Sequence, residues 1–433
     1  MLSLINKKII DLADSLALKV DEPLTCNDRF EHVATNLMNG QVNTQLLVGE
    51  NLTYLKGLVL DASKLIDVCY IDPPYNTGSK FLYRDSRKSS NHPLFGSHAT
   101  WMEFMLPRLV LAKELLKPDG VIAISIDDYE LAYLKFLMDR VFGEENFICN
   151  VIVCRSKNGK GGKKNVATNH EYLLIYGNSK NAKLNGDVDK GEYPKSDEYG
   201  CFRTDGLFRK KGDASLRTDR PNMYYPLYFD ASTGKVSTEP VDGWGVVYPK
   251  DSKGVERRWL WGRETAKDRE WQLFASSKGV IYVKNYASEK GESKRIKIRT
   301  IWSESPFYTE RATNELKDTF GSKVFDTPKP VEYIKKVIDV CGDSEAIVLD
   351  FFAGSATTAQ AVYELNNSDG GNRKCLLMEI DAPIPVDHAA HKAGFNTIAD
   401  IAKARLHKIK EHDLDFYFSC TYINEIVEST SVN

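Results

Sequence analysis

The sequence predicts an α/β protein in which a doubly wound, mainly parallel sheet is interrupted by a smaller β-rich domain. The first observation is a set of short apolar runs, QLLVG, IDVCYI, GVIAISI, AIVLDFF and CLLME. Their length and continuity are typical of strands buried on both faces. The second is helical periodicity between these runs, and strand–helix alternation favours a parallel sheet with helices on both faces. The third is a change of composition in the middle of the chain.

Four segments carry the helical periodicity. In the first half these are WMEFMLPRLVLAKELLK (101–117) and DYELAYLKFLMDRVF, which ends just before Gly143. In the last third they are KPVEYIKKVIDVC and TIADIAKARLHKIKEH. We expect these helices to cover the two faces of the sheet.

Residues 180–305 differ from both flanks. They are rich in Gly, Asp, Lys and aromatic residues, and the stretch WGVVYPKDSKGVERRWLWGRETAKDREWQLF holds four of the six tryptophans. GVIYVKN and RIKIRTIW resemble strands. We therefore expect an inserted β-rich domain at 180–305 between two core segments, 41–179 and 306–433. NDRFEHVATNLMNG predicts an appended helical piece within 1–40.

The composition is that of a soluble globular protein, with 42% hydrophobic and 27% charged residues. No apolar run approaches the roughly 18 residues of a membrane span. The N-terminus mixes acidic and basic residues, unlike a signal peptide. The eight cysteines form no CxxC pair, so neither a metal site nor a disulfide framework is indicated. These features predict a cytoplasmic protein with no metal and no membrane partner.

The net charge of −2 hides an uneven distribution. Residues 151–300 contain 30 Lys+Arg and 19 Asp+Glu, whereas the rest of the chain contains 28 and 41. A basic island in an acidic protein suggests a polyanionic partner. The alternative is a solvated face without a partner.

Two strand ends carry unusual residues. IDPPYNTG (71–78) follows an apolar run with two prolines, which cannot continue a central strand. In an open parallel sheet, ligands bind outside the carboxyl ends of the strands. Asp72 and Tyr75 are therefore candidate site residues, and the alternative is an ordinary turn.

The second strand end is VLDFFAGSATTAQAVYEL (348–365). Asp350 ends the strand, Gly354 allows a tight turn, and small residues open a helix whose N-terminus a ligand can approach. Glu379 ends the KCLLMEID strand, at a distance from the glycine turn where an acid commonly accepts from ribose hydroxyls. A plain strand–helix turn and a surface carboxylate are the alternatives.

Together, DPPY and the later FAGS loop resemble the S-adenosylmethionine-dependent amino-methyltransferases of DNA, in the order typical of their β group. LLVGENL, PRLVLAKELLKPDGVIAISIDDYE and DTPKPVEYI look like segments of the Mod subunits of type III restriction–modification systems and their solitary relatives. The resemblance extends over most of the chain and is weakest in 180–305, where such enzymes carry target recognition. It implies a Rossmann-like S-adenosylmethionine-dependent methyltransferase core, double-stranded DNA as substrate and a homodimer.

The resemblance also gives DPPY a mechanism. An exocyclic amino nitrogen is a poor nucleophile because its lone pair is delocalised into the ring. The Asp72 carboxylate and the Pro73 carbonyl would accept its N–H groups, with Pro74 holding that carbonyl rigidly. Tyr75 would stack on a base flipped out of the duplex. The implied cofactor contacts are Asn51, Asp72, Asp326, Lys329, Asp350, Phe352, Ala353, Gly354, Ser355, Thr358 and Glu379. For Asn51, Asp326 and Lys329 the alternative is a capping or turn role.

Three further segments suit DNA. Residues 86–98 are expected to form a loop over the target base. The glycine-rich segment CRSKNGKGGKKN suits phosphate contacts, and RRWLWGR could read or stack on bases. A solvated loop and the core of a small β domain are the respective alternatives. The candidate DNA contacts are Arg155, Lys157, Lys160, Lys163, Lys164, Arg257, Arg258, Trp259, Trp261 and Arg263.

Two departures from the family pattern stand out. Ala356 replaces the last glycine of FAGSG, which fits if its φ is helical but not if φ is positive. We expect cofactor binding to survive. The chain ends soon after DLDFYFSCTYIN, where longer Mod subunits continue, which leaves a restriction subunit as partner open.

We therefore predict a site-specific DNA adenine-N6 methyltransferase, within or derived from a restriction–modification system. DPPY favours adenine, since cytosine-N4 enzymes of this superfamily more often carry SPPY. Cytosine-N4 methylation and a non-catalytic DNA-binding specificity subunit are the alternatives.

Overall fold

A computed structural model of the protein describes residues 37–422, except 38, 41, 62–63, 77–97, 160–164 and 290–291. The chain forms two compact units. The first, the core unit, comprises Met1–Asn185 and Ile298–Asn433, and the second, the inserted unit, is Gly186–Lys297. The predicted helical piece in 1–40 lies almost wholly outside the described residues, as does the predicted loop at 86–98 apart from His98.

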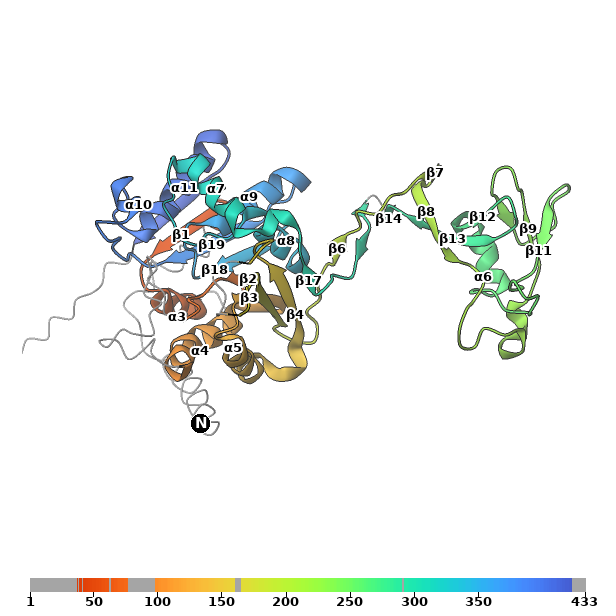
Figure 1. Ribbon diagram of the computed structural model, residues 1–433, viewed down its shortest axis with the longest axis horizontal. Helices are drawn as coiled ribbons and strands as arrows, with labels where there is room; N and C mark the ends of the chain where they lie inside the picture. The colour runs from red at the N-terminus through yellow and green to blue at the C-terminus, as the bar shows by residue number, and fades with distance from the viewer. Residues whose placement is uncertain are drawn as a thin grey trace, which may run out of the picture. The chain divides into compact units, whose positions relative to one another are not determined.

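The described part of the core unit is built on a nine-stranded sheet (Figure 1). Strand β5 is antiparallel to both of its neighbours, and the other neighbouring strands pair in parallel. In spatial order the strands are β17 (Ile301–Trp302), β4 (Phe147–Cys154), β5 (His170–Gly177), β3 (Leu116–Ile126), β2 (Ile66–Ile71), β18 (Ile347–Asp350), β19 (Lys374–Glu379), β1 (Thr44–Val48) and β20 (Phe418–Tyr422).

Helices cover both faces of this sheet, as Figure 1 shows. Neighbouring strand residues alternate between the two layers: Cys69 packs with one set of helices, and Val68 and Tyr70 pack with the other. The predicted fold class is therefore confirmed. One set is α3 (Asn51–Asp61), α4 (His98–Leu115) and α5 (Leu131–Met138), which continues as a π-helical turn, Asp139–Gly143. The other is α8 (Val331–Cys341), α9 (Thr357–Asp369) and α11 (Ile398–His412), while α7 (Thr309–Phe320) and α10 (Ala389–Lys392) pack in a smaller cluster with α11.

The two strands that carry the sequence motifs are neighbours. β2 and β18 pair in parallel, with Val68 opposite Val348 and Cys69 opposite Leu349. Because parallel strands end at the same edge, the DPPY segment after β2 and the FAGS loop after β18 emerge side by side. β19, which ends at Glu379, lies on the other side of β18. This edge is where ligands bind in open α/β sheets.

The inserted unit is β-rich. Its core contains Phe208, Tyr225, Trp259 and Leu273. It begins and ends inside the predicted 180–305 boundaries, at Gly186 and Lys297. One sheet has the order β12 (Leu273–Ala275), β13 (Ile281–Tyr286), β8 (Gly200–Leu207), β7 (Lys195–Asp197), and a second has β10 (Val236–Ser237), β9 (Leu227–Phe229), β11 (Gly245–Val247). The pairs β6 (Asp187–Val188) with β16 (Arg295–Ile296) and β14 (Ser288–Glu289) with β15 (Glu292–Ser293), and the helix α6 (Arg263–Asp268), complete it.

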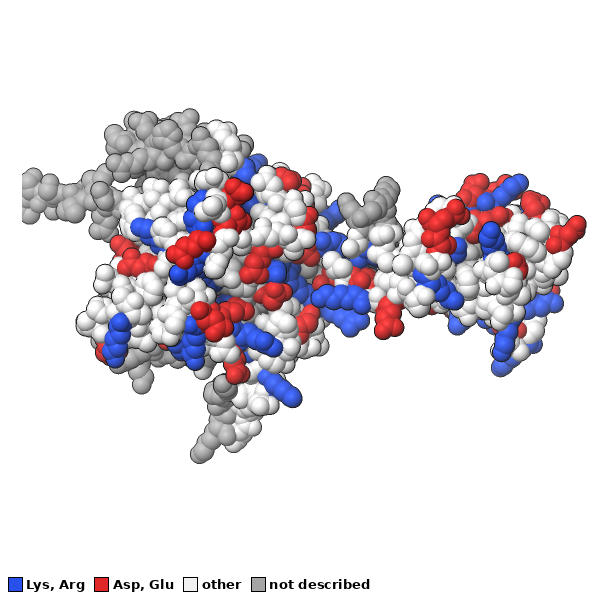
Figure 2. All heavy atoms as spheres, turned by 90° about the horizontal axis from the view of Figure 1, so that it is seen from above, with Lys and Arg blue, Asp and Glu red and all other residues white. Residues whose placement is uncertain are grey.

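The basic island is divided unequally between the units. The inserted unit, 186–297, has 22 Lys+Arg and 18 Asp+Glu, whereas residues 151–185 of the core unit have seven and one. Figure 2 shows acidic and basic side chains interspersed on the face that it presents. Most of the excess positive charge therefore lies in the segment that precedes the insertion.

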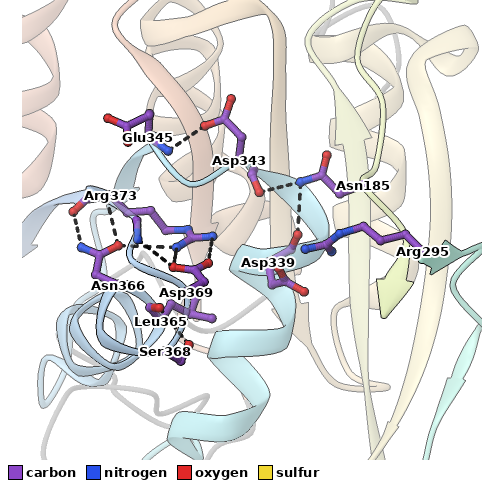
Figure 3. Close-up of polar contacts among 12 residues, drawn as sticks. Asn185, Arg295, Asp339, Asp343, Glu345, Leu365, Asn366, Ser368, Asp369 and Arg373 are labelled. Atoms are coloured by element: carbon purple, nitrogen blue, oxygen red, sulfur yellow. Dashed lines mark hydrogen bonds and ion pairs between the residues drawn. The ribbon is translucent and has the colours of Figure 1, made fainter. Parts of the chain in front are cut away.

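The point where the chain leaves the core unit is anchored on α8. The backbone N–H of Asn185 donates to the carbonyl of Val340 (2.8 Å). Its side-chain amide donates to the carbonyls of Asp339 (3.2 Å) and Gly342 (2.6 Å), as Figure 3 shows. The last carbonyls of a helix lack partners within it, so Asn185 satisfies the end of α8 and fixes the exit of the chain.

Within the described ranges, no helix is long and apolar enough to cross a membrane.

Candidate active site

Asp72 and Tyr75 of the DPPY segment are joined directly. The Tyr75 hydroxyl donates to Oδ1 of Asp72 at 2.5 Å. The Lys329 ammonium donates to the Tyr75 hydroxyl at 2.8 Å and lies 3.2 Å from the same Oδ1. No described residue donates to Oδ2 of Asp72. One carboxylate oxygen is therefore held by the protein and the other is left for a ligand.

Lys329 is itself held by a residue that the motifs did not indicate. Its Nζ donates to both carboxylate oxygens of Glu171, each at 2.7 Å. Glu171 lies on β5 with a side chain 3% exposed, and the Lys329 side chain is 12% exposed. Arg155 approaches from the partly exposed side, with its guanidinium 3.7 Å from Glu171 Oε2. A buried glutamate, a buried lysine and Asp72 thus form one charge cluster.

The charges around Asp72 act in opposite directions. Burial raises the pKa of Asp72, the Lys329 ammonium lowers it, and the Glu171 carboxylate raises it further. Burial also raises the pKa of Tyr75 well above its usual range, so its hydroxyl remains a donor. Burial is the largest of these effects, so the pKa of Asp72 is raised overall, and Lys329 is the main group that opposes the shift.

The two prolines differ in what their carbonyls do. The indole N–H of Trp101, on α4, donates to the carbonyl of Pro74 at 2.6 Å. Within the described residues, the carbonyl of Pro73 accepts no hydrogen bond. The Pro-Pro unit is thus fixed at its second carbonyl and leaves the first one available.

A second cluster holds the end of the DPPY segment. Asn76 has a φ of 54°, and its amide donates to Oε1 of Glu130 at 2.7 Å. The His98 ring nitrogen lies 2.9 Å from the same oxygen. Glu130 is fully buried. This cluster links DPPY to the start of α4, and neither Glu130 nor Asn76 was predicted from the sequence.

The FAGS loop is closed by Asp350. Its Oδ1 accepts the backbone N–H of Phe352 (3.0 Å), and its Oδ2 accepts the hydroxyl of Thr358 (2.5 Å), in the first turn of α9. Burial raises the pKa of Asp350 to about 7, while these hydrogen bonds oppose the shift. Asp350 therefore bridges the beginning and the end of the loop. Ala353 and Ser355, also predicted to contact the cofactor, are buried within it.

Glu379 faces the same loop from β19. Its Oε2 accepts the backbone N–H of Gly354 at 2.5 Å, and burial raises its pKa to about 8. Gly354 has a φ of 54°, and a Cβ there would lie 3.2 Å from the Phe325 ring. Only glycine fits comfortably in such a position. A buried carboxylate beside a glycine turn suits a ligand that offers hydroxyl donors or positive charge, which fits the ribose and sulfonium of S-adenosylmethionine.

Ala356 does not have the helical φ on which the favourable sequence expectation depended. It is the residue before α9, with φ 59° and ψ 33°, in the left-handed region, and its side chain is fully buried. Alanine is tolerated there only at a cost in conformational energy, because Cβ crowds the neighbouring carbonyl. The loop therefore keeps a glycine-like backbone without the glycine.

Asn51 and Asp326 have partners within the protein. The Asn51 amide donates to the carbonyl of Phe351 (2.7 Å), and its oxygen accepts from Arg108 Nε (2.7 Å). Asp326 lies 3.7 Å from Lys323 and 3.5 Å from the His388 ring. Asn51 thus anchors α3 to the FAGS loop. Contact of either residue with the cofactor stays a prediction.

Two members of the RRWLWGR segment, Arg258 and Trp259, are buried, which argues against the base contacts predicted for them. Trp259 is 2% exposed, stacks on Phe208 and donates its indole N–H to the carbonyl of Tyr225. Arg258 is 9% exposed and donates to the carbonyl of Ala214 at 2.6 Å. Both residues pack within the inserted unit, and their contact with DNA stays a prediction that this burial disfavours.

The other members of RRWLWGR also have internal partners. Arg257 forms an ion pair with Asp251 at 2.9 Å. Arg263 lies 3.2 Å from Glu239, and Trp261 is partly buried against Phe208. Of the other predicted DNA contacts, Arg155 approaches Glu171, Lys157 is exposed, and Lys160, Lys163 and Lys164 lie outside the described residues.

A profile of the family described as DNA methylase matches residues 66–384. The chain belongs to this family. It is 58% identical to the type II methyltransferase M.KpnI of Klebsiella pneumoniae, over 87% of this chain and 90% of that protein. It is 33% identical to the EcoPI Mod subunit, a type III restriction–modification enzyme of Escherichia phage P1, over 84% of this chain and 62% of that subunit.

The chain also matches solved structures at low sequence identity. The complex of M1.HpyAVI with SAM is 13% identical, with a TM-score of 0.37, over 84% of this chain and 99% of that one. The PvuII DNA methyltransferase, specific for cytosine N4, is 12% identical, with a TM-score of 0.42, over 83% and 92%. Family membership makes the protein a DNA methyltransferase with S-adenosylmethionine as methyl donor, which confirms these predictions from the motifs.

Proposed function

We propose that this methyltransferase transfers the methyl group to N6 of an adenine flipped out of duplex DNA. The observation that carries the proposal is the pair of open acceptors, Asp72 Oδ2 and the Pro73 carbonyl, at the sheet edge shared with the FAGS loop. Two acceptors on one amino group favour the tetrahedral nitrogen whose lone pair can attack. Because these acceptors are fixed before the substrate arrives, they stabilise the transition state at little reorganisation cost.

The methyl donor supplies an electrophilic methyl group on a sulfonium when bound. Glu379 and the backbone of Gly354 are the groups best placed to hold its ribose, and Phe352 offers a partly exposed ring beside them. Asp350 and Thr358 keep the loop in shape through their mutual hydrogen bond. The two carboxylates, with pKa values raised to about 7 and about 8, would favour a ligand that brings positive charge.

Tyr75 has two functions in this proposal. Its ring provides a stacking surface for the flipped base, an interaction worth about 1–3 kcal/mol per base. Its hydroxyl fixes Asp72 Oδ1, so that Oδ2 points to the amino group. The stacking role predicted from the sequence involves only the ring. The hydroxyl contact makes Tyr75→Phe a substitution that should also disturb Asp72.

The inserted unit is proposed to recognise the target sequence, although not through RRWLWGR. Arg209, Lys210 and Lys211 line one pocket together with Leu207, Leu260 and Asp205, and Asp205 is paired with Arg203 at 2.7 Å. Within the described residues, the three basic side chains have no hydrogen bond or ion pair. Unpaired cations on a β-rich unit suit contacts with DNA phosphates.

Homodimerisation, a restriction subunit as partner and action on DNA in the cytoplasm are further proposals. They are supported by the kinship to both a type II methyltransferase and type III Mod subunits. Light scattering of the purified protein, with and without duplex DNA, tests the dimer.

The base is tested by product analysis. The purified protein is incubated with genomic DNA from an unmethylated host and labelled methyl donor, and the hydrolysed nucleosides are separated by mass spectrometry. N6-methyladenine supports the proposal, and N4-methylcytosine would replace it with the cytosine alternative. Absence of both products, with cofactor binding intact by calorimetry, would favour the non-catalytic specificity subunit.

A further inference from the structure

We infer that Glu171 and Lys329 are positioning residues for the methyl transfer: Glu171 holds the Lys329 ammonium beside Oδ1 of Asp72, so that Asp72 keeps its other oxygen, Oδ2, ionised and open for the amino group. The inference rests on the proposed role of Asp72. It assigns roles to two residues that belong to neither the DPPY nor the FAGS motif. It also changes the predicted role of Lys329 from cofactor contact to control of Asp72.

The geometry shows which carboxylate the lysine prefers. Lys329 Nζ makes two contacts of 2.7 Å with Glu171 and one of 3.2 Å with Asp72. The shorter, bidentate contacts indicate that Glu171 is the principal counter-ion. Because an ammonium has three N–H donors, two go to Glu171 and the third to the Tyr75 hydroxyl. Asp72 therefore shares the cation through its longer contact at Oδ1, and Oδ2 makes no contact with the ammonium.

This arrangement keeps Asp72 ionised with one oxygen open, which a simple lysine–aspartate ion pair would not do. If Glu171 did not hold Lys329, the ammonium would be free to bind Oδ2 of Asp72 as well and would compete with the substrate amino group for that oxygen. If no cation were present, two buried carboxylates would repel each other and Asp72 would take up a proton. With Lys329 present but held by Glu171, Asp72 stays charged while Oδ2 stays open. Holding a buried glutamate and lysine in this way is costly unless each is paired, as here.

Other titratable groups also face Asp72, and none duplicates this control. Tyr70 on β2 and Tyr333 on α8 are buried, with pKa values raised well above the usual range, so they remain neutral. Asp350 on β18 is a further acid, held by Thr358. Arg155, beyond Glu171, is 36% exposed and screened by solvent. Lys329 is thus the buried cation of the described cluster.

The inference predicts opposite pH shifts for the two substitutions. Asp72 must be ionised to accept from the amino group, so the rate falls as pH drops through its pKa. Glu171→Gln removes a negative charge, which lowers the pKa of Asp72 and moves this acid limb to lower pH. Lys329→Met removes the positive charge, which raises the pKa and moves the limb to higher pH. Each shift should be about one pH unit, given an effective dielectric constant near 20.

The experiment measures single-turnover methyl transfer to duplex DNA from pH 5.5 to 8.5, with saturating cofactor. The plateau rate should fall about tenfold in either single variant. The double variant Glu171→Gln/Lys329→Met should return the acid limb close to its wild-type position. Lys329→Arg, which keeps the charge, should leave the limb in place. Glu411→Gln, which breaks an exposed ion pair with Lys408, is the matched control and should change nothing.

Thermal melting and cofactor titration show that each variant is folded. If Lys329→Met does not fold, Glu171→Gln, Lys329→Arg and the double variant still test the direction of the shift. An acid limb that stays in place in Glu171→Gln, or single-variant shifts in the same direction, would overturn the inference. Asp72→Asn distinguishes failure of the proposed function from failure of the inference about Glu171 and Lys329. Full activity in Asp72→Asn would overturn the proposed function itself, whereas an inactive Asp72→Asn with an unmoved limb in Glu171→Gln overturns only the inference.

Discussion

The conspicuous sequence motifs of the core unit and of the inserted unit differ in burial: those of the core unit leave groups open to a ligand, whereas that of the inserted unit helps to form a hydrophobic core. In the core unit, DPPY and FAGS lie at the ends of adjacent strands, and Asp72 keeps one carboxylate oxygen open. In the inserted unit, the conspicuous RRWLWGR segment contributes Trp259 to the hydrophobic core, with Leu260 and Trp261 packed against it. A motif that follows a strand lies at the edge of the sheet, where its side chains can contact a ligand. A run of tryptophans in a small β unit is instead needed to fill the core.

The largest effect that separates the two regions is expected at Asp72. Asp72→Ala removes an acceptor used only when the amino nitrogen attacks, so methyl transfer should fall at least about a thousandfold. Cofactor affinity should change much less. Transfer of labelled methyl groups and calorimetry measure the two quantities, with the exposed Asp119→Ala as control. Near-normal transfer by Asp72→Ala would mean that DPPY is not catalytic.

The sequence was sufficient for strands β1, β2, β3, β18 and β19, for helices α4, α5, α8 and α11 and for both motifs, because these depend on local patterns. The runs IDVCYI and CLLME correspond to β2 and β19 almost residue for residue. It did not predict β4, β5 or β20. β5 begins with His and Glu, which resemble a surface segment. Glu171 can be buried because it pairs with Lys329. That partner lies 158 residues away in the sequence, and no local pattern reveals such a pairing.

A second contrast concerns Trp259 of the inserted unit. Replacing this buried ring by alanine should destabilise the unit by about 3–5 kcal/mol. We therefore expect Trp259→Ala to make residues 186–297 sensitive to protease and to abolish DNA binding, while the core unit still binds cofactor. Trp271, 39% exposed and beside Tyr199, is the matched control, and Trp271→Ala should leave the unit intact. Loss of DNA binding in Trp259→Ala with normal protease resistance would instead support a base-stacking role for Trp259.

A third prediction locates the DNA contacts of the inserted unit. In Arg209→Gln/Lys210→Gln/Lys211→Gln, the plot of log affinity against log salt should become less steep by about 0.9 for each phosphate that the variant no longer binds. Fluorescence anisotropy with labelled duplex DNA at several salt concentrations measures the slope. The control is Arg217→Gln, because Arg217 is already paired with Glu256 at 2.9 Å. An unchanged slope in the triple variant would place the phosphate-binding residues elsewhere.

The smallest expected effect is at Ala356, where opposing terms nearly cancel. Ala356→Gly relieves the left-handed conformation, which costs alanine about 1–2 kcal/mol. Against this, glycine gains about 0.4–1 kcal/mol of freedom in the unfolded chain and loses a buried methyl worth about 0.8 kcal/mol. The net change in unfolding free energy should stay within about 1 kcal/mol by these figures. Because φ is already 59°, the loop need not move, and cofactor affinity should be unchanged.

Ala356→Val, unlike Ala356→Gly, should weaken cofactor binding. A β-branched side chain is a strong outlier at positive φ, and the site is fully buried, so the FAGS loop must shift. Valine should therefore weaken cofactor binding at least tenfold by calorimetry, with Gly354 pulled away from Glu379. If valine bound cofactor as tightly as alanine and glycine do, the loop would not depend on a left-handed residue before α9. The glycine of the family pattern would then be replaceable for a reason other than backbone geometry.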